Sequence, residues 1–368
     1  MTEPIINPSY TEIRPQAGGM YPWEQDLPDE YWEYRRLWSE YPRTFTVSRF
    51  PLHLDIETTR RCNLRCPHCM RTNIKAAGKI GEIGDMDLNT FMAVIDEGAE
   101  KGLRAIKLNY MGEPLLHPDL PVMVQYAKEK GVLDVRLNTN ATLLTPALGE
   151  ALIRAGLDRL ACSFDSIDPD RYEALRPGAN YHDVIENITA FMRLRERIRI
   201  VWKPNECPPG TLFPVVTVSM VRMKENADEA EAFRMFWQSK VDLVTFVDYQ
   251  NPLGLDPVDR TVGEQRRVTA PCAQLWQRLF VWWDGMIHLC CGDYLGDVRL
   301  GKVGERTIED AWHGPELEHF RKMHRMEWGH KLAFCARCNA NKVFDRGGDQ
   351  YVRGERIGGH DGREENHG

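Results

Sequence analysis

The chain has 368 residues, of which 42% are hydrophobic and 27% charged, so it can bury a full-sized core domain and a smaller second one. Its formal net charge of −7 argues against nucleic acid as a partner, and no apolar run is long enough to span a membrane. The N-terminus, Met-Thr-Glu-Pro, lacks the basic start and apolar core of a signal peptide. We therefore expect a cytoplasmic protein, in which clustered cysteines bind metal rather than form disulfides.

Proline and aromatic residues are frequent in residues 1–50, among them Trp23, Trp32 and Trp38. We expect this segment to be an arm packed over the main domain. The alternative is a lid or a segment that docks a partner.

Strand-like and helix-like patterns alternate from residue 52 onward. The expected strands are short, apolar and partly β-branched, as buried parallel strands are, and cover residues 52–58, 105–111, 133–138, 160–165, 214–222 and 244–249. The expected helices cover about 87–102, 118–130, 145–155, 168–176, 181–195 and 225–239, the first with Asp87 as N-cap and Gly102 at its end. Six strands are too few for an eight-fold barrel. We therefore predict an α/β fold with a partial (β/α)6 barrel over residues 51–255.

Three segments depart from this alternation. Residues 197–213 contain Lys-Pro and Pro-Pro-Gly and are expected to form a loop insertion at the rim of the barrel. Residues 265–345 hold four clustered cysteines and paired aromatic residues, which predicts a small domain stabilised by metal ligation. Residues 346–368 are rich in glycine and charge and are expected to be a disordered tail.

The first set of cysteines, Cys62, Cys66 and Cys69, lies in the sequence C-N-L-R-C-P-H-C just after the first predicted strand. Structural zinc sites have four ligands, so three thiolates with no nearby fourth make a poor zinc site. Three thiolates suit a [4Fe–4S] cluster whose fourth iron stays open for a small molecule. Loops that follow the strands of barrels and open α/β sheets carry active sites, so we expect the chemistry here.

This Cys-x3-Cys-x2-Cys loop and its context resemble the radical S-adenosylmethionine (SAM) superfamily. In that family the amino and carboxylate groups of SAM chelate the open iron. An electron from the cluster then cleaves SAM to methionine and a 5′-deoxyadenosyl radical that abstracts hydrogen. The resemblance implies a [4Fe–4S] cluster on the first cysteine set, SAM bound beside it, and an electron donor such as flavodoxin or ferredoxin.

Residues near the ends of the predicted strands match further positions of the superfamily. Met111-Gly112-Glu113-Pro114 resembles the Gly-Gly-Glu element that contacts the SAM amino group, with Met111 in place of the first glycine. The resemblance assigns contacts with SAM, or with SAM and substrate, to His68, Gly112, Glu113, Asn138, Asn140, Ser163, Asp165, Arg176 and Met220. Core packing of Met220 and a surface position for Arg176 at a helix end are equal alternatives.

The second set of cysteines follows the pattern Cys272-x12-Gly285-x4-Cys290 and then Cys335-x2-Cys338. Four thiolates can close a metal site, and the Cys-x2-Cys half alone would also permit a zinc ribbon. The spacing resembles the auxiliary-cluster domains called SPASM and, because it supplies ligands for one cluster only, their shortened form, twitch. The resemblance implies a second [4Fe–4S] cluster that carries one electron. Twitch enzymes include dehydrogenases that oxidise a hydroxyl group of an aminocyclitol.

Together the two sets indicate a radical SAM enzyme acting on a hydroxylated small molecule, such as a sugar, nucleotide sugar or aminocyclitol. After hydrogen abstraction and loss of the hydroxyl proton, the second cluster can take one electron and leave a ketone. Cys291, beside Cys290, supports the alternative of an epimerase in which its thiol returns a hydrogen atom, with Cys162 and Cys207 as weaker candidates. A buried, inert Cys291 is the other alternative.

Two further alternatives fit the sequence less well. A peptide-modifying SPASM maturase often carries an N-terminal peptide-binding domain, and residues 1–50 are short for one. A non-catalytic iron–sulfur electron carrier would leave the strand-end motifs without a purpose. Side chains that could line the substrate pocket are those of Asn109, Tyr110, Arg136, Lys203 and Gln250.

Overall fold

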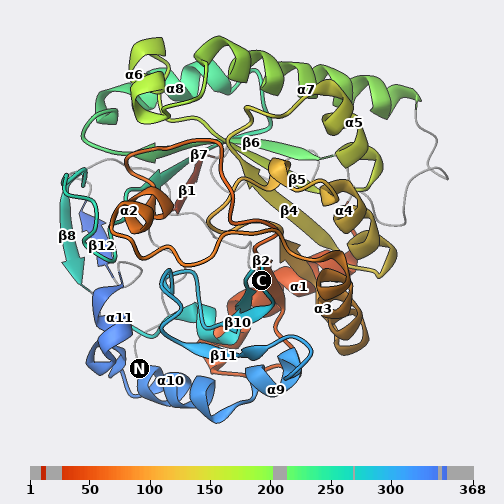
Figure 1. The fold of residues 1–368 in the computed structure, drawn as a ribbon, viewed down its shortest axis with the longest axis vertical. Helices are drawn as coiled ribbons and strands as arrows, with labels where there is room; N and C mark the ends of the chain where they lie inside the picture. Colours follow the sequence, from red (N-terminus) through yellow and green to blue (C-terminus); the bar gives the residue numbers. More distant parts are fainter. Residues whose placement is uncertain (1–9, 14–26, 202–213, 268–269, 339–341, 346–368) are drawn as a thin grey trace, which may run out of the picture.

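The computed structural model describes residues 10–13, 27–201, 214–267, 270–338 and 342–345. Its centre is a ten-stranded sheet in the order β1-β7-β6-β5-β4-β3-β2-β9-β10-β11. Strands β2 to β7 run parallel and alternate with helices, which confirms the predicted partial barrel (Figure 1). Their bounds are β2 His53–Ile56, β3 Ala105–Lys107, β4 Asp134–Thr139, β5 Arg159–Ser163, β6 Val215–Arg222 and β7 Leu243–Asp248.

The crossover helices begin and end at local signals in the sequence. In α3 (Leu88–Lys101) the Asp87 carboxylate accepts a hydrogen bond from the Thr90 backbone N–H, and Gly102 ends the helix in the left-handed region at φ 93°, as predicted. The other helices of the barrel are α2 Met70–Ala76, α4 Leu120–Glu129, α5 Pro146–Arg154, α6 Pro169–Leu175, α7 Tyr181–Val201 and α8 Ala230–Trp237.

The structure describes residues 197–201 of the expected rim loop and none of the expected tail. Helix α7 continues to Val201, so residues 197–201 are helical and the prediction of a loop there is wrong. The apolar and charged side chains of this stretch continue the pattern of α7 until the prolines that follow it. Residues 202–213 and 346–368 lie outside the described residues.

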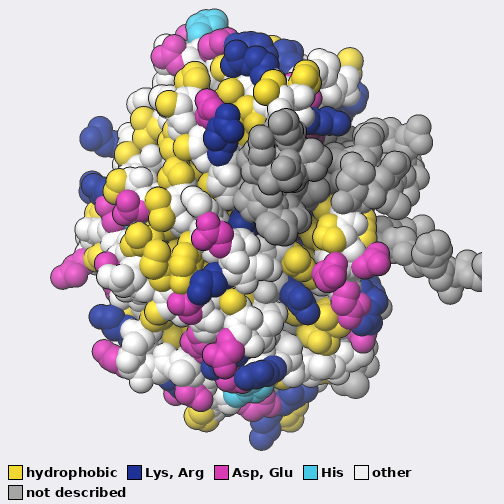
Figure 2. Space-filling view, turned by 90° about the vertical axis from the view of Figure 1, so that its right-hand side faces the viewer, with side chains coloured by type: hydrophobic (Ala, Val, Ile, Leu, Met, Phe, Trp, Pro, Cys, Tyr) yellow, Lys and Arg dark blue, Asp and Glu magenta, His cyan; other side chains and the backbone are white. Residues whose placement is uncertain are grey.

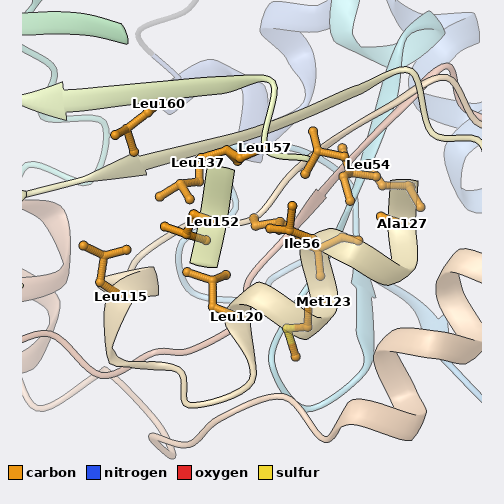
Figure 3. Close-up of a cluster of buried hydrophobic side chains, with 14 of the residues drawn as sticks. Leu54, Ile56, Leu115, Leu120, Met123, Ala127, Leu137, Leu152, Leu157 and Leu160 are labelled. Carbon is orange, nitrogen blue, oxygen red and sulfur yellow. The ribbon is translucent and has the colours of Figure 1, made fainter. Parts of the chain in front are cut away.

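Side chains alternate along the parallel strands between an apolar outer face and a polar inner face. On the outer face, Leu54, Ile56, Leu137 and Leu160 are buried in one cluster with Met123 of α4 (Figure 3). Burial of each such side chain stabilises the fold by roughly 1.5–3 kcal/mol, so this layer holds the helices on the sheet. The inner face carries the alternate positions, among them Asp55, Glu57, Lys107, Asn109, Arg136, Asn138, Ser163, Thr217 and Ser219.

The segment before β2 packs against the amino-terminal ends of the strands. Helix α1 (Asp29–Thr44) buries Tyr31 and Tyr34 against Leu52 and Ala105. Strand β1 (Tyr10–Ile13) pairs antiparallel with β7 and extends that edge of the sheet. The described part of the expected arm is therefore a helix and an edge strand.

The second set of cysteines belongs to a unit that continues the same sheet. Strand β9 (Arg278–Val281) pairs in parallel with β2, and β10 (Met286–His288) and β11 (Arg299–Lys302) follow antiparallel. Because β2 leads directly into the first cysteine loop, the β2–β9 pairing fixes the two cysteine sets relative to each other. The unit also contains η5 Ala273–Trp276, α9 Ile308–Trp312, α10 Pro315–Arg325, η6 Gly329–Lys331, α11 Ala333–Arg337 and a separate β8–β12 pair, Glu264–Arg267 with Lys342–Asp345.

The surface carries charges of both signs. Acidic and basic side chains are interspersed over the described part of the face shown in Figure 2. This mixture agrees with the modest formal net charge of −7. Within the described ranges, none of the helices combines the length and the apolar character that crossing a bilayer requires.

Candidate functional site

The first cysteine set lies in the loop that joins β2 to α2. Cys66 is buried, Cys62 and Cys69 are half-buried, and the Cys69 backbone N–H donates to the Cys66 carbonyl oxygen at 3.1 Å. Burial raises the pKa of Cys66 to about 12, although nearby Arg176 opposes the shift. Burial also raises the pKa of Cys62. Such thiols stay protonated at neutral pH unless a bound cation holds them as thiolates.

Gly112 lets the chain after β3 approach the cysteine loop closely. The Glu113 backbone N–H donates to the Arg61 carbonyl oxygen at 2.7 Å. A Cβ at position 112 would lie 2.0 Å from the Thr59 carbonyl oxygen and 2.8 Å from that of Arg61. Only glycine permits this approach, so Gly112 has a packing role in shaping the loop that the sequence analysis did not anticipate.

The Glu113 carboxylate joins the ends of β3 and β4. It accepts hydrogen bonds from the Thr139 hydroxyl at 2.6 Å and from the Asn140 backbone N–H at 2.7 Å. The Asn140 side chain donates in turn to Asn63, inside the cysteine loop, at 2.9 Å. Burial raises the pKa of Glu113, and the hydrogen bonds that it accepts oppose this shift. Glu113 and Asn140 thus brace the loop, whereas Asn138 exposes its side chain.

His68 of the cysteine loop forms a buried cluster with Asp165 and Arg176. The Asp165 carboxylate lies 2.7 Å from the Arg176 guanidinium and 3.2 Å from His68 Nε2. Burial alone would raise the pKa of Asp165, but Arg176 and His68 hold it well below its usual range. The alternative of a surface position for Arg176 is wrong, because its side chain is only 7% exposed and paired with Asp165.

Two buried nitrogens of this cluster, His68 Nδ1 and Arg176 Nε, have no hydrogen-bond partner among the described residues. Arg176 Nε is a donor, and His68 Nδ1 is an acceptor when the ring proton lies on Nε2, which faces Asp165. A buried polar group without a partner costs about 1–3 kcal/mol. The pair therefore fits a bound group that offers both acceptors and donors, as the carboxylate and amino groups of SAM do.

The ends of β5 and β6 present two serines to the inner face. Ser163 and Ser219 are direct partners across the two strands. Met220, for which contact with SAM and core packing were equal alternatives, lies on the outer face and is fully buried in the hydrophobic core. Contact with SAM is therefore wrong and core packing is confirmed, because side chains alternate along a strand and only the neighbours of Met220 lie on the inner face. Cys162 is buried on the outer face in the same way, and Cys207 lies outside the described residues.

Two thiols of the second cysteine set, those of Cys290 and Cys338, lie against Gly292. A Cβ at this position would lie 3.6 Å from Cys338 Sγ and 3.8 Å from Cys290 Sγ. Burial raises the pKa of Cys290 well above its usual range, and the neighbouring thiols, among them the other three of the set, raise it further. Grouped thiols of this kind deprotonate together only around a cation.

Four thiolates can hold either a single metal ion or an iron–sulfur cluster. A tetrahedral zinc ion with Zn–S bonds of about 2.3 Å needs sulfurs about 3.8 Å apart. In the parts of the chain that the structure describes, no three His, Cys, Asp or Glu side chains converge closely enough to hold one ion. Four cysteine thiolates are the usual donor set of a [4Fe–4S] cluster, and the second set supplies four.

Cys291 lies beside the second set with hydrogen-bond partners of its own. Its Sγ accepts from the Gln274 side-chain amide at 3.3 Å, and its carbonyl oxygen accepts from the Tyr110 hydroxyl at 2.9 Å. Tyr110 stacks on Tyr294 with ring centroids 5.5 Å apart. The Cys291 thiol is half-buried and is not needed to complete the set of four.

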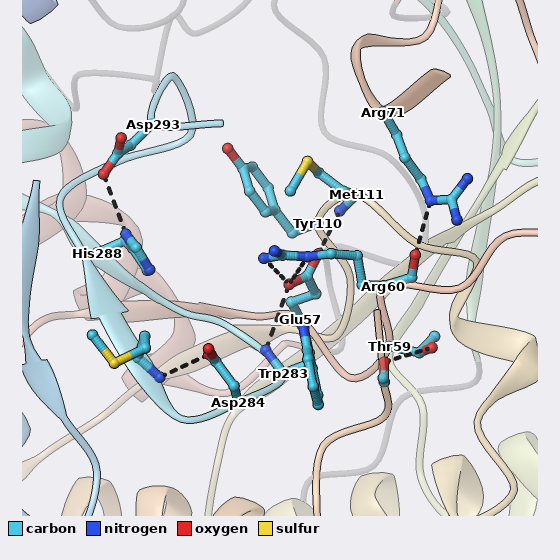
Figure 4. Close-up of polar contacts among 12 residues, drawn as sticks. Glu57, Thr59, Arg60, Arg71, Tyr110, Met111, Trp283, Asp284, His288 and Asp293 are labelled. Carbon is cyan, nitrogen blue, oxygen red and sulfur yellow. Dashed lines mark hydrogen bonds and ion pairs between the residues drawn. The ribbon is translucent and has the colours of Figure 1, made fainter. Parts of the chain in front are cut away.

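A buried ion pair that the sequence analysis missed ties the first cysteine loop to the second unit (Figure 4). Glu57, directly after β2, accepts from Arg60 Nη2 at 2.8 Å, and the two side chains are 0% and 5% exposed. The Arg60 guanidinium stacks over the Trp282 ring at 4.0 Å. The signal was an acidic residue at the end of an apolar strand, three residues before an arginine, but nothing in the sequence pointed to Trp282.

Charged side chains line the inner face closer to the amino-terminal ends of the strands. Asp55 lies 2.5 Å from Lys107 Nζ and 3.1 Å from Arg278 Nη1. Burial would raise the pKa of Asp55, but the two cations lower it to about 2. Arg136 follows Lys107 in register on β4. Lys203, also expected at the pocket, lies outside the described residues.

Two protein-family models match the chain. The model of the radical SAM superfamily matches residues 56–206, and that of the SPASM iron–sulfur cluster-binding domain matches residues 272–339. The first match contains the first cysteine set, and the second match contains the second set.

Three curated relatives show how far the similarity extends. A probable GTP 3′,8-cyclase of Methanococcus maripaludis is 34% identical over 134 residues, 36% of this chain and 43% of that protein. A GTP 3′,8-cyclase of Limosilactobacillus fermentum is 24% identical over 325 residues, 87% of this chain and 81% of that protein. A tungsten-containing aldehyde ferredoxin oxidoreductase cofactor-modifying protein of Pyrococcus furiosus is 33% identical over 176 residues, 47% of this chain and 44% of that protein. The chain thus spans less than half the length of the first and third.

Solved structures share the fold at low sequence identity. BtrN in complex with AdoMet and 2-DOIA has a TM-score of 0.52 at 18% identity and covers 80% of this chain and 94% of that one. Streptococcus suis SuiB bound to its precursor peptide SuiA has a TM-score of 0.57 at 14% identity, over 80% and 72% of the chains. Native anSMEcpe with bound AdoMet has a TM-score of 0.55 at 14% identity, over 74% and 84%.

Proposed function

The chain carries a radical SAM domain followed by a SPASM iron–sulfur cluster-binding domain, and from this premise we propose that it oxidises a secondary alcohol of a hydroxylated small molecule to a ketone. The observation that carries the proposal is the parallel pairing of β9 with β2. This pairing places a three-thiol loop and a four-thiol site on one sheet. A radical enzyme that removes a hydrogen atom and then an electron needs two such redox sites near one substrate.

The residues present fit two [4Fe–4S] clusters and SAM. The three cysteines of the first set would hold the SAM-binding cluster, and the four of the second set would hold the auxiliary cluster. When bound, these groups supply a 5′-deoxyadenosyl radical at the first set and an acceptor for one electron at the second. An external donor such as flavodoxin or ferredoxin would supply the electron that starts the reaction.

Residues beside the first set would orient SAM. Arg176 Nε and His68 Nδ1 are two buried nitrogens without a hydrogen-bond partner among the described residues, and they suit the carboxylate and amino groups of SAM. Asn138, whose side chain is exposed on the inner face, suits the ribose hydroxyls. Glu113 is braced by Thr139 and Asn140, so its carboxylate is fixed before SAM binds.

The inner face suits a substrate with several hydroxyl groups. Ser163, Ser219 and the charged cluster of Asp55, Lys107 and Arg278 provide donors and acceptors on neighbouring strands. In the proposed reaction the carbinol carbon loses a hydrogen atom to the 5′ carbon, the hydroxyl group loses a proton, and one electron leaves the substrate. The product is a ketone, two hydrogens lighter than the alcohol.

Epimerisation is the second candidate, and the position of Cys291 favours it. This thiol is half-buried, lies outside the main core and is not required by the auxiliary site. A thiol so placed can return a hydrogen atom to the substrate radical. The product would then be an isomer of unchanged mass.

One experiment separates the two candidates. The reconstituted protein is incubated with SAM and dithionite in deuterated water, together with a panel of aminocyclitols, free sugars and nucleotide sugars. Oxidation predicts one compound that loses two mass units, and the same reaction in Cys291→Ala. Epimerisation predicts a compound that gains one deuterium, and loss of this gain in Cys291→Ala. A panel in which no hydroxylated compound is consumed, although 5′-deoxyadenosine forms, would refute the proposed substrate class.

A further inference from the structure

His324 of α10 lies between two cysteines of the second set. Its Nδ1 accepts a hydrogen bond from the Cys272 backbone N–H at 3.2 Å, and its Nε2 lies 3.4 Å from Cys335 Sγ. The side chain is only 2% exposed. Cys272 directly precedes η5 and Cys335 lies in α11, so the imidazole ring contacts two separate segments of the second cysteine site.

These two contacts determine which ring nitrogen carries the proton. A nitrogen that accepts a hydrogen bond from an amide N–H has a free lone pair and no proton. Nδ1 of His324 is therefore unprotonated, and the proton of the ring lies on Nε2. Nε2 then faces Cys335 Sγ as a donor, which makes this contact an N–H···S hydrogen bond.

The chain after α10 clamps the ring in this orientation. Gly329 presses against it so closely that a Cβ at position 329 would lie 2.4 Å from Cε1 and 2.9 Å from Nε2. Two backbone hydrogen bonds close the turn that brings Gly329 there. The Glu327 N–H donates to the His324 carbonyl oxygen at 3.0 Å, and the Trp328 N–H donates to the Met323 carbonyl oxygen at 2.8 Å. The imidazole is thus held by its neighbours on one side and by two cysteines on the other.

We propose that His324 is a positioning residue that donates an N–H···S hydrogen bond to Cys335 and thereby raises the reduction potential of the auxiliary cluster. Reduction adds negative charge to the cluster and its thiolate sulfurs. A fixed donor beside one of these sulfurs stabilises the reduced state more than the oxidised state. A higher potential makes the cluster a better acceptor for the electron that the substrate gives up.

The inference rests on the proposed function, because it requires an iron–sulfur cluster on the second cysteine set. It adds a residue that neither the cysteine spacing nor the strand-end motifs indicate. His324 lies 52 residues from Cys272 and 11 residues from Cys335 in sequence, and both contacts arise only when the chain folds around the second cysteine set.

The test measures the midpoint potential of the auxiliary cluster by electron paramagnetic resonance during a redox titration. The full-length protein carries Cys62→Ala, Cys66→Ala and Cys69→Ala, so only the auxiliary cluster contributes to the signal. In this background we compare His324 with His324→Phe, which removes the donor, and with His324→Gln, whose amide restores an N–H. His324→Asn, whose shorter amide does not reach Cys335, is a second variant without a donor to the sulfur. His319→Phe, at an exposed position of the same helix, is the matched control.

We expect the ratio of reduced to oxidised cluster at a fixed ambient potential to fall at least tenfold in His324→Phe and His324→Asn, which corresponds to about 59 mV for a one-electron couple. His324→Gln should recover at least half of this shift, and His319→Phe should show none. An unchanged potential in the variants without a donor, with iron retained, would overturn the inference. Loss of iron in all three His324 variants would also overturn it, since His324 would then be a ligand or a structural support. Absence of iron in the background protein itself would refute the proposed auxiliary cluster instead.

Discussion

Replacing Gly112 by alanine tests whether the chain after β3 shapes the first cysteine loop. The added Cβ would lie 2.0 Å from the Thr59 carbonyl oxygen, where an ordinary carbon–oxygen contact is about 3.3 Å. The two segments must therefore separate by about 1.3 Å. The hydrogen bond from Glu113 to Arg61, now 2.7 Å long, would stretch to about 4 Å and be lost.

The free-energy cost of this separation is the sum of an overpacking term and the loss of one hydrogen bond. Overpacking in a well-packed region costs about 1–3 kcal/mol. The lost hydrogen bond adds about 1 kcal/mol. A penalty of about 3 kcal/mol lowers the population of the native loop relative to displaced forms by about a hundredfold. We expect the first cluster to be lost and the second to be retained.

The assay is the iron content of the anaerobically reconstituted protein, together with the rate of 5′-deoxyadenosine formation. Wild type should hold about eight iron atoms per chain, and Gly112→Ala about four, with no 5′-deoxyadenosine formed. Met111→Leu is the matched control, because this swap conserves volume at the neighbouring buried position. If Gly112→Ala kept all of its iron and the wild-type rate, the reasoning from the close approach would be refuted.

Two further predictions concern the buried charges around the sheet. Arg60→Gln leaves the buried Glu57 carboxylate without its ion-pair partner and should lower the free energy of unfolding, measured in guanidinium chloride, by about 3–5 kcal/mol. Arg61 forms an exposed pair with Asp85, so the control Arg61→Gln should lower it by at most about 1 kcal/mol, and equal losses in the two variants would contradict the role of burial. The pKa of Asp55 is lowered to about 2, below its unfolded value of about 3.9, so its stabilisation is complete above about pH 4 and is lost as the pH falls toward 2. Asp55→Asn should therefore lower the free energy of unfolding at pH 7 by about 2 kcal/mol in urea denaturation, and an unchanged value would show that the neighbouring cations do not stabilise this carboxylate.

The parallel strands of the barrel were predictable because each is a short apolar run between turn signals. Strand β6 shows this well, since Val215 to Met220 are mostly β-branched or apolar and follow a proline. The assignment of faces was harder, and Met220 shows why. A single strand pattern does not say which of its two faces meets the helices, and the register with β5 decides it.

Features that depend on contacts between segments far apart in the chain could not be predicted from the sequence. The run from Leu279 to Val281 is apolar, but the pairing of this strand with β2 joins segments more than two hundred residues apart. From the sequence, Arg176 at a helix end could equally be solvent-exposed or contact SAM. Its ion pair with Asp165 in the structure shows that it is buried. Helix α1 was missed for a local reason, because aromatic residues occur on several of its faces and obscure its periodicity.

The most direct test of the central claim is the reductive cleavage of SAM by the reconstituted chain. With SAM and dithionite under anaerobic conditions, we predict methionine and 5′-deoxyadenosine in equal amounts from wild type and from Cys338→Ala, and neither product from Cys66→Ala. Wild-type protein that holds about eight iron atoms per chain and forms no 5′-deoxyadenosine would contradict the assignment of the first cysteine set.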